Sequence, residues 1–355
     1  MKLQKYASIN GLRALSILLV IIGHLNVQYG LLQPMISIRW LRPLTDMLYD
    51  GHLGVNVFFV ISGFLITSLM MQEEAITGKI SLKNFYIRRT LRIFPAYYTL
   101  LLVYGILQYC GYLHLSSESW LTALTYTKYF NWTLDWYTAH AWSLSIEEHF
   151  YLFWPLIFLA GDKRRKHLAF ALTAAVPLVR TFTYFHPVSW MNDLTLFTRI
   201  DSIAIGCLVA LYREEIIRLL RPYWTSAFLI SGLLLMMLRY ASIVAAKVHL
   251  EFIFIPLGLT HGTIGNILIA VIMVYSVFGP ESVWYRFLNL RLLNYIGILS
   301  YSIYLWQEPF LYRTGYWVNQ LPQNLLMVVL FALGSYYLVE KPFLKLKSKF
   351  SGING

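Results

Sequence analysis

The sequence predicts an all-α polytopic membrane protein with about ten transmembrane helices and both termini in the cytoplasm. Hydrophobic residues make up 58% of the 355 positions and charged residues only 13%, which is about half of the charged fraction of a soluble domain. Apolar stretches recur from end to end, and the basic residues between them are shared unevenly between alternate loops. These observations exclude a disordered chain, a disulfide scaffold and an ordinary soluble enzyme.

The apolar stretches give the predicted helices in chain order. They cover residues 8–28, 52–72, 93–113, 142–160, 168–185, 198–212, 223–240, 253–278, 293–312 and 322–340, at roughly 20 residues per crossing. The first stretch follows Lys2 and Lys5, as in a signal peptide, but no small-x-small cleavage site comes after it, so we expect a retained helix. We expect one transmembrane domain over 1–345 and a short cytoplasmic tail over 346–355.

The distribution of basic residues sets the orientation. With ten spans the termini share one side of the membrane, and twenty of the 29 Lys and Arg residues fall on that side, against six on the other. The positive-inside rule therefore predicts cytoplasmic termini. Because topology explains most of the net charge of +12, we do not expect nucleic-acid binding.

Seven ionisable residues fall inside the predicted helices, where each costs at least a few kcal/mol unless it has an internal partner. Structural pairing explains one or two of them, but seven favour a polar cavity for a charged or strongly polar substrate. They are Arg13, His24, Glu147, Glu148, Arg180, Arg199 and Asp201. Cys110 and Cys207 also lie in apolar segments, so neither a disulfide nor a thiolate metal site is expected.

Arg13 and His24 are eleven residues apart on the first predicted helix. Eleven steps of about 100° come within about 20° of three full turns and rise about 16 Å, so both side chains face the same way. A lone helical histidine is more often a core residue than a catalytic one. The shared face favours catalysis.

Arg88, Arg89 and Arg92 precede Ile93 at the predicted cytoplasmic entry of the third helix. The positive-inside bias explains part of this motif. Arg89 and Arg92 are also i, i+3 neighbours on one helical face, and guanidinium groups suit bidentate phosphate contacts. The motif alone leaves both interpretations open: topology signal, or binding site for a phosphorylated cytoplasmic cofactor.

Ser143, Glu147 and Glu148 lie near the outer end of the fourth predicted helix. Ser143 and Glu147 are i, i+4 neighbours, and Glu148 lies about 100° away. Adjacent carboxylates in a membrane helix argue for a functional role. The segment has no His-Glu-x-x-His pattern, so no metal is expected.

Two further segments carry polar side chains. Arg199 and Asp201 offer an opposite-charge pair, for which a structural salt bridge is the competing interpretation. Tyr304, Trp306 and Gln307 end the ninth predicted helix towards the outside. They are either interface aromatics or part of a surface that stacks against and hydrogen-bonds a sugar.

Together these motifs resemble the acyltransferase-3 family of membrane acyltransferases, which modify sugars and lipids in bacteria. The resemblance runs through almost the whole chain, and its specificity comes from several motifs in the same order. They are Asn10-Gly11-Leu12-Arg13 with His24, Gly54-Val-Asn56 with Ser62-Gly63, Arg89-x-x-Arg92, Trp142-Ser143-Leu-x-x-Glu147, Arg199-x-Asp201, Tyr301-Ser-Ile-Tyr304-Leu-Trp306 and Glu340-Lys341-Pro342-Phe343.

The resemblance implies a bacterial inner-membrane enzyme with a cytoplasmic acyl-CoA donor, most often acetyl-CoA. It implies that the acceptor is a hydroxyl of a cell-envelope glycan or glycolipid. His24 would be the catalytic histidine with Arg13 as its partner, and Arg89 and Arg92, with Arg88 beside them, would hold the phosphates of the donor.

This sequence departs from the family pattern at two positions. Asn56 stands where Asp is usual, and Gln307 stands where His is frequent. Both keep hydrogen bonding and lose titration, which affects specificity more than the reaction class. The soluble esterase-like domain that some members append is not expected here.

The predicted reaction is O-acyl transfer, in which His24, oriented by Glu147 or Glu148, deprotonates the acceptor hydroxyl. A covalent acyl-histidine intermediate is equally compatible. Candidates for stabilising the oxyanion are Arg180, Arg199, Ser143 and Asn56. Candidates for binding the substrate are Ser143, Glu148, Asn56, Arg199, Asp201, Tyr304, Trp306 and Gln307.

The main alternative is a transporter or flippase for a polar glycan or glycolipid, because buried charges also mark a substrate pathway. A structural membrane scaffold is a third class, and it leaves the seven embedded charges unexplained.

Overall fold

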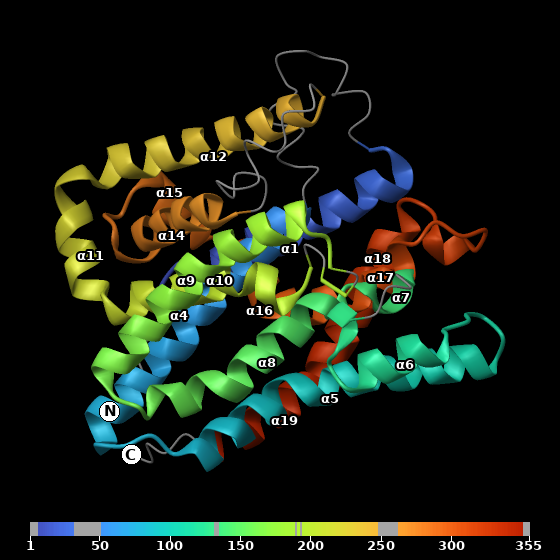
Figure 1. The fold of residues 1–355 in the computed structure, drawn as a ribbon. Helices are drawn as coiled ribbons and strands as arrows, with labels where there is room; N and C mark the ends of the chain where they lie inside the picture. The colour runs from blue at the N-terminus through green and yellow to red at the C-terminus, as the bar shows by residue number, and fades with distance from the viewer. Residues whose placement is uncertain are drawn as a thin grey trace. The chain divides into compact units, whose positions relative to one another are not determined.

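The computed structural model describes residues 6–31, 51–130, 135–188, 190–191, 194–247 and 262–350 (Figure 1). Within these ranges, six helical segments are long and apolar enough to cross a membrane. They are α1 (Ile9–Tyr29), α4 (Gly51–Thr77), α5 (Leu82–Tyr109), α9 (Asp162–Phe185), Arg213–Ser242 and Gln323–Lys347. The prediction of an all-α, multi-pass membrane protein is confirmed to this extent. Ten spans and cytoplasmic termini stay predictions.

Two of these six segments consist of several helices, and the structure has further, shorter helices. The segment Arg213–Ser242 contains α11 (Arg213–Leu220) and most of α12 (Trp224–Lys247), and Gln323–Lys347 contains α18 (Gln323–Gly334), the π-helical η4 (Ser335–Glu340) and α19 (Lys341–Lys347). The others are α6 (Ser117–Leu124), α7 (Trp136–Ala139), α8 (Ala141–Phe158), α10 (Leu196–Leu211), α14 (Thr263–Phe278), α15 (Val283–Leu288), α16 (Arg291–Trp306) and α17 (Glu308–Leu311).

Helix α5 begins at Leu82, well before the predicted start at residue 93. Ser81 caps it, because its Oγ accepts a hydrogen bond from the backbone N–H of Asn84 at 3.3 Å, which satisfies a donor that the first turn leaves open. Pro95 lies inside the helix without ending it. The arginine motif therefore lies within α5 rather than in front of it.

The predicted helix over 293–312 is divided in two. Helix α16 ends at Trp306 and α17 begins at Glu308, with Gln307 between them. Pro309 lies in the first turn of α17, and proline cannot donate the N–H that a continuous helix needs there. Of the predicted helix over 253–278, residues 253–261 lie outside the described part of the chain.

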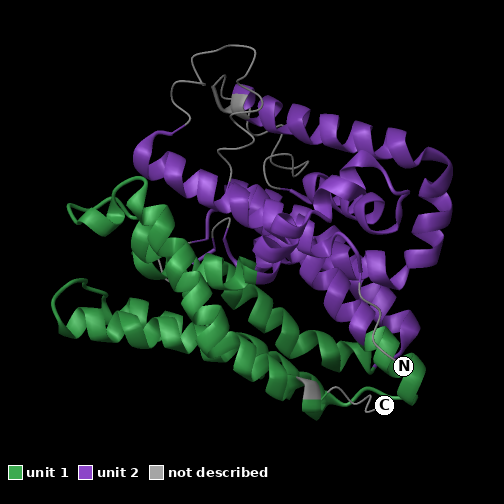
Figure 2. Cartoon of the chain, turned by 180° about the vertical axis from the view of Figure 1, so that it is seen from behind, with its two compact units in different colours: residues 1–4, 70–159, 299–355 green, residues 5–69, 160–298 purple. Residues whose placement is uncertain are grey.

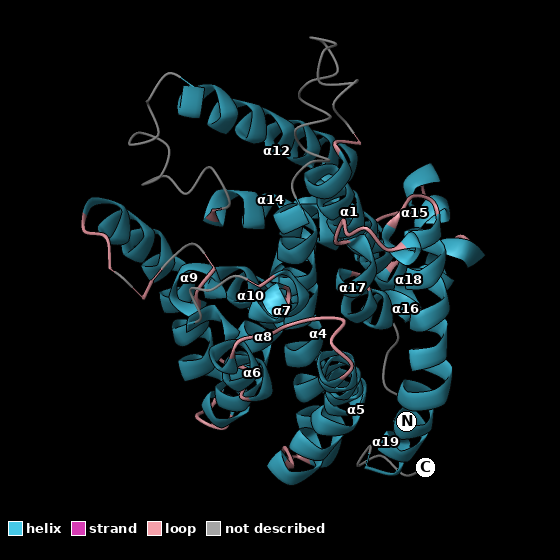
Figure 3. Cartoon of the chain, turned by 90° about the vertical axis from the view of Figure 1, so that its right-hand side faces the viewer, coloured by secondary structure: helices cyan, strands magenta, loops and turns pink. Residues whose placement is uncertain are grey.

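The chain divides into two compact units, which Figure 2 shows in different colours. Unit 1 comprises residues 1–4, 70–159 and 299–355, and unit 2 comprises residues 5–69 and 160–298. In unit 1, α19 and η4 pack along α5, and α17 packs against α7 and α18. In unit 2, α10 packs against α9 and α14, and α14 also packs against α12 and α1 (Figure 3).

Two glycines bring α4 and α10 into backbone contact within unit 2. A Cβ atom at Gly63 would lie 1.9 Å from the carbonyl oxygen of Ile203, and one at Gly206 would lie 2.1 Å from the carbonyl oxygen of Val60. Small residues at a crossing let membrane helices approach closely, which strengthens their van der Waals packing. The predicted motif residue Gly63 therefore has a packing function.

A buried ion pair in unit 1 joins Lys128, which follows α6, to Asp135, which precedes α7. The Nζ atom of Lys128 lies 2.6 Å from Oδ2 of Asp135, and Lys128 is 1% exposed. The same carboxylate accepts hydrogen bonds from the hydroxyls of Ser119 and Thr138, each at 2.7 Å, and from the backbone N–H of Thr138. This charge is fully partnered, which indicates a structural role.

From the ion pair of Asp135 we expect the stability of the fold to fall at acidic pH. Burial alone would raise the pKa of Asp135, but the hydrogen bonds from Lys128, Thr138 and Ser119 outweigh it and lower this pKa. The ion pair therefore stabilises the fold above about pH 4, and this contribution is lost as the pH falls through the lowered pKa. Asp135→Asn should cost about 3 kcal/mol at neutral pH, because it leaves Lys128 buried without its counter-charge.

The measurement is the thermal unfolding temperature in detergent between neutral and acidic pH, with the exposed Glu118→Gln as control. The wild type should lose more stability on acidification than Asp135→Asn. Parallel pH profiles for the two proteins would contradict this role of Asp135.

Candidate active site

The arginine motif of α5 meets acidic and aromatic side chains inside unit 1. The guanidinium of Arg89 lies 3.8 Å from the ring centroid of Tyr151 on α8, in cation–π geometry. Arg92 interacts electrostatically with Glu147 on α8 and with Glu340 at the end of η4. The structure thus brings a predicted phosphate-binding residue and a predicted catalytic carboxylate together.

Arg88 has other partners. Its Nη2 atom lies 2.6 Å from Oε2 of Glu73 at the end of α4, and its Nη1 donates a hydrogen bond to the carbonyl oxygen of Phe350 at 2.9 Å. The carboxylate of Glu73 also accepts the backbone N–H of Ser81 at 3.1 Å. Arg88 therefore connects three segments of unit 1.

Glu148 follows Glu147 on α8 and lies within electrostatic range of Arg89. Its Oε1 atom is buried and has no hydrogen-bond partner among the described residues. Both predicted carboxylates of α8 therefore lie within electrostatic range of the arginine motif.

A second polar cluster joins the start of α8 to the end of α16. The hydroxyls of Ser143 and Tyr304 lie 2.6 Å apart, and the hydroxyl of Tyr304 donates to the carbonyl oxygen of His140 at 2.9 Å. The Nδ1 atom of His140 lies 4.0 Å from Oε1 of Glu308, and both side chains are buried. Two residues that were predicted separately, Ser143 and Tyr304, are thus direct partners.

Trp306 and Gln307 lie at the same end of α16. Gln307 is completely buried, and neither its Nε2 nor its Oε1 has a hydrogen-bond partner among the described residues. The Nε1 atom of Trp306 is likewise buried and unpartnered within that part of the chain. Buried polar atoms without partners are costly, so these groups are available to a hydroxyl-bearing ligand.

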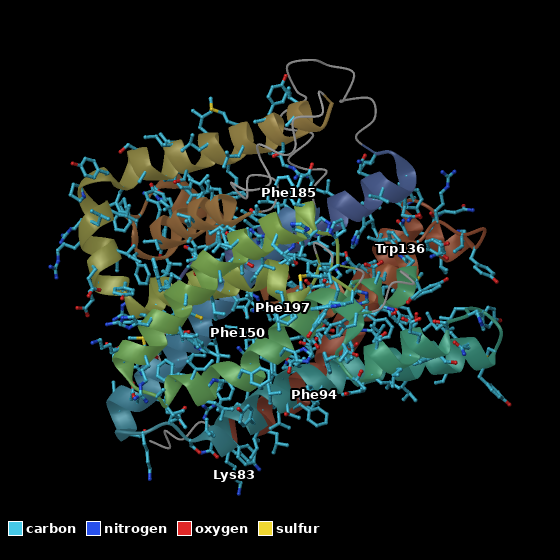
Figure 4. The ribbon with its side chains drawn as sticks, in the orientation of Figure 1. Lys83, Phe94, Trp136, Phe150, Phe185 and Phe197 are labelled. Atoms are coloured by element: carbon cyan, nitrogen blue, oxygen red, sulfur yellow. The ribbon has the colours of Figure 1, made fainter. Side chains whose placement is uncertain are left out.

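His140, Glu308 and Trp136 were not predicted from the sequence. Trp136, labelled in Figure 4, donates its Nε1–H to the carbonyl oxygen of Glu308 at 3.0 Å. His140 and Glu308 each adjoin a predicted motif, Trp142-Ser143 and Trp306-Gln307 respectively. Adjacency to a motif was the available signal, but the pairing depends on the tertiary fold.

Unit 2 holds the other predicted site residues. Arg13 and His24 lie on the continuous helix α1, so the predicted shared face is retained, and both are half-buried. The structure places Glu147 and Glu148 in unit 1 and His24 in unit 2. Orientation of His24 by either carboxylate stays a prediction.

The ion pair that the structure gives Asp201 is with Arg180, at 2.8 Å, rather than with the predicted partner Arg199. Residues at i and i+2 of a helix point to different sides, whereas α9 brings Arg180 against α10. The carboxylate of Asp201 also accepts the hydroxyl of Thr263 at 2.6 Å. Arg199 donates a hydrogen bond to Oδ1 of Asn56 at 3.3 Å.

Comparison with known proteins decides the family. The model of the acyltransferase domain of acyltransferase family 3 matches residues 6–339. The chain belongs to this family. The match covers the arginine motif with Glu147 and Glu148, the polar cluster of Ser143 and Tyr304, and the helix that carries Arg13 and His24, so the expected resemblance is confirmed.

Two relatives from Staphylococcus aureus illustrate the similarity. The O-acetyltransferase OatA of strain NCTC 8325 is 28% identical over 368 residues, which cover 95% of this chain and 57% of the relative. A protein of strain COL, also named for O-acetyltransferase activity, is 28% identical over 386 residues, covering 97% of this chain and 58% of its own length. The chain therefore spans less than two thirds of these relatives. No solved structure matches the chain.

Proposed function

We propose that this protein is an integral-membrane O-acyltransferase that moves an acetyl group from cytoplasmic acetyl-CoA to a hydroxyl of a cell-envelope glycan or glycolipid. The observation that carries the proposal is the grouping of Arg92 with Glu147 and of Arg89 with Glu148, between α5 and α8, inside a chain of acyltransferase family 3. We further propose that the acyltransferase domain covers residues 1–345 and lies in the bacterial inner membrane.

The donor phosphates are proposed to bind Arg89 and Arg92. Guanidinium groups at i and i+3 can each donate two hydrogen bonds to phosphate oxygens. The stacking of Arg89 on Tyr151 at 3.8 Å limits the freedom of that side chain, which lowers the entropic cost of binding. The pantetheine arm would extend from this site towards the membrane interior.

The acceptor is proposed to bind near the polar cluster at the start of α8. Ser143 and Tyr304 supply hydroxyls, and Gln307 supplies a donor and an acceptor that are unpartnered among the described residues. Tyr304 and Trp306 also offer aromatic faces. This combination suits a ring that carries several hydroxyls, as a sugar does.

The chemical step is proposed to use His24 as the general base. His24 takes the proton of the acceptor hydroxyl while the hydroxyl oxygen attacks the thioester carbonyl carbon. The C–S bond then breaks, and the thiolate of coenzyme A leaves and is protonated. A covalent acyl-histidine is the alternative route, in which His24 Nε2 or Nδ1 carries the acetyl group before the acceptor attacks.

Donor binding can be tested with purified protein in detergent. Coenzyme A at about 100 times its Kd should stabilise the fold by about 2.7 kcal/mol and raise the thermal unfolding temperature. Arg92→Ala and Arg89→Ala should each weaken coenzyme A binding about tenfold or more, because each removes charge-assisted hydrogen bonds. Lys83→Ala is the matched control, since Lys83 is exposed on the same helix (Figure 4).

The transporter alternative predicts a different result. A transporter or flippase without acyl transfer has no use for an acyl donor, so coenzyme A should not change the unfolding temperature. A wild-type protein that folds and shows no response to coenzyme A would therefore reject the acyltransferase proposal.

A further inference from the structure

The C-terminal segment of unit 1 returns to the arginine motif of α5. Helix α19 packs along α5, and the carbonyl oxygen of Phe350, just beyond it, accepts a hydrogen bond from Arg88 at 2.9 Å. Lys347 is the last residue of α19 and is half-buried. This arrangement places a lysine from the far end of the chain at the predicted phosphate site.

The surroundings of Lys347 are unusual for a half-buried cation. The charged groups that act on its ammonium are Arg88, Arg89 and Arg92, which are all positive. The part of the chain that the structure describes contains no ion pair to Lys347; the acidic neighbours Glu73 and Glu340 interact with Arg88 and Arg92 instead. Like charges in a partly buried site repel, so an anion is needed to offset this repulsion.

The guanidinium of Arg88 is already engaged within the protein and has little capacity left to bind a phosphate. Its two terminal nitrogens already contact Glu73 at 2.6 Å and the carbonyl oxygen of Phe350 at 2.9 Å. These bonds tie the end of α4 and the C-terminal segment to α5. Arg88 thus holds in place the segment that carries Lys347.

We propose that Lys347 is a phosphate-binding residue that completes the donor site with Arg89 and Arg92, and that Arg88 is a positioning residue rather than a phosphate ligand. The inference rests on the proposed acyl-CoA donor and adds a residue from the C-terminal helix to its site. A lysine ammonium serves as a point charge for a phosphate group, whereas arginine gives bidentate contacts. The donor class is therefore a thioester carrier with several phosphates, as in coenzyme A.

The first experiment measures binding of coenzyme A and of pantetheine, which lacks phosphates, by calorimetry with the full chain in neutral detergent. Lys347→Ala should weaken coenzyme A binding about tenfold, the loss of one hydrogen bond to a charged group, and leave pantetheine binding unchanged. Lys347→Arg should bind coenzyme A nearly as well as the wild type. Lys345→Ala removes the same charge from an exposed position of α19 and should have no effect.

Salt dependence separates a phosphate contact from a merely structural role. Coenzyme A affinity of the wild type should fall as salt rises, and the fall should be smaller in Lys347→Ala, because one screened charge interaction is gone. Equal affinity of wild type and Lys347→Ala for coenzyme A would overturn the assignment. A wild type that binds no coenzyme A would instead overturn the proposed donor.

The phosphate of an anionic lipid offers the same chemistry, so a second arm adds phosphatidylglycerol to the detergent-purified protein. Loss of stabilisation by this lipid in Lys347→Ala, with coenzyme A binding retained, would make the site a lipid-headgroup site and overturn the proposal. The expected result for Lys347→Ala is that coenzyme A binds about tenfold more weakly and that the lipid still stabilises the protein.

The two possible roles of Arg88 predict opposite changes in coenzyme A affinity when Glu73 is replaced by glutamine. If Arg88 were a phosphate ligand, Glu73→Gln would free its guanidinium and remove a negative charge, and coenzyme A would bind more tightly. If Arg88 is a positioning residue, Glu73→Gln should lower the unfolding temperature without ligand and weaken coenzyme A binding. Tighter binding in Glu73→Gln would overturn the assignment of Arg88.

Discussion

Replacement of His24 by alanine is expected to lower the rate of acetyl transfer by about 10²–10⁴-fold, the usual contribution of a general base, while coenzyme A binding persists. The reason is that the donor phosphates are proposed to bind Arg89 and Arg92, and His24 is proposed to act only on the acceptor hydroxyl. The measurement is acetyl transfer in membranes that contain equal amounts of inserted protein. Coenzyme A-dependent thermal stabilisation of the same variant reports whether it is folded.

A matched control for this variant is His114→Ala, which removes an exposed histidine between α5 and α6 and should keep full activity. Turnover of His24→Ala at the wild-type rate would remove His24 from the mechanism. Rapid quenching of the wild type also distinguishes the two routes, since only the covalent route leaves an acetyl group on the histidine.

Alanine at Gly63 is expected to destabilise the protein by about 3 kcal/mol or more, as overpacking of a tight contact does. A Cβ atom there would lie 1.9 Å from the carbonyl oxygen of Ile203, and this neighbour is backbone that no side-chain rotation can move away. Gly206→Ala should behave alike, because its Cβ would meet the carbonyl oxygen of Val60 at 2.1 Å. Lower unfolding temperatures in detergent and reduced yield in membranes are the measurements.

Gly232 provides the control for the glycine prediction. It lies inside α12, and nothing lies within 4 Å of a Cβ built at that position. Because alanine favours a helix over glycine by about 1 kcal/mol, Gly232→Ala should be neutral or slightly stabilising. If Gly63→Ala were as stable as Gly232→Ala, α4 and α10 would not be held by backbone contact at this crossing.

The sequence predicted the helical membrane class and most helix positions because an apolar stretch of about 20 residues matches the thickness of the hydrocarbon core of a membrane. The predicted helix boundary was wrong where charged residues lie inside a helix, as at the start of α5. The start of α5 was predicted at residue 93 because its first turns carry Lys83 and three arginines, yet the Ser81 cap starts the helix at Leu82. The change from polar to apolar residues shows where a helix enters the membrane, but the helix itself can begin several residues earlier.

The candidate site was predictable to the extent that it follows helical spacing. Three features follow from helical spacing within a single helix. They are the i, i+3 arginines of α5, the paired glutamates of α8 and the shared face of Arg13 and His24 on α1. Partners from distant segments were not predictable in this way. The pairing of Asp201 with Arg180, the contact of His140 with Glu308 and the return of Lys347 to α5 depend on how helices pack.

The embedded charges are now divided between two roles. Arg180 and Asp201 satisfy each other, as the structural interpretation expects, and they need no substrate. Glu147 and Glu148 face arginines that are proposed to bind the donor. A polar cavity is therefore needed for fewer residues than the sequence suggested, and two of these, Glu147 and Glu148, lie within electrostatic range of the proposed donor site.

The central claim is acetyl transfer from coenzyme A to an envelope hydroxyl. The most direct test supplies acetyl-CoA, isotopically labelled in the acetyl group, to the cytoplasmic face of membrane vesicles and follows label into alkali-labile acetyl esters of the glycan and glycolipid fraction. We expect labelled ester with the wild-type protein, and label incorporated at least about 100-fold more slowly with His24→Ala. Absence of labelled ester with a folded wild-type protein that binds coenzyme A, or equal labelling by both proteins, would contradict it.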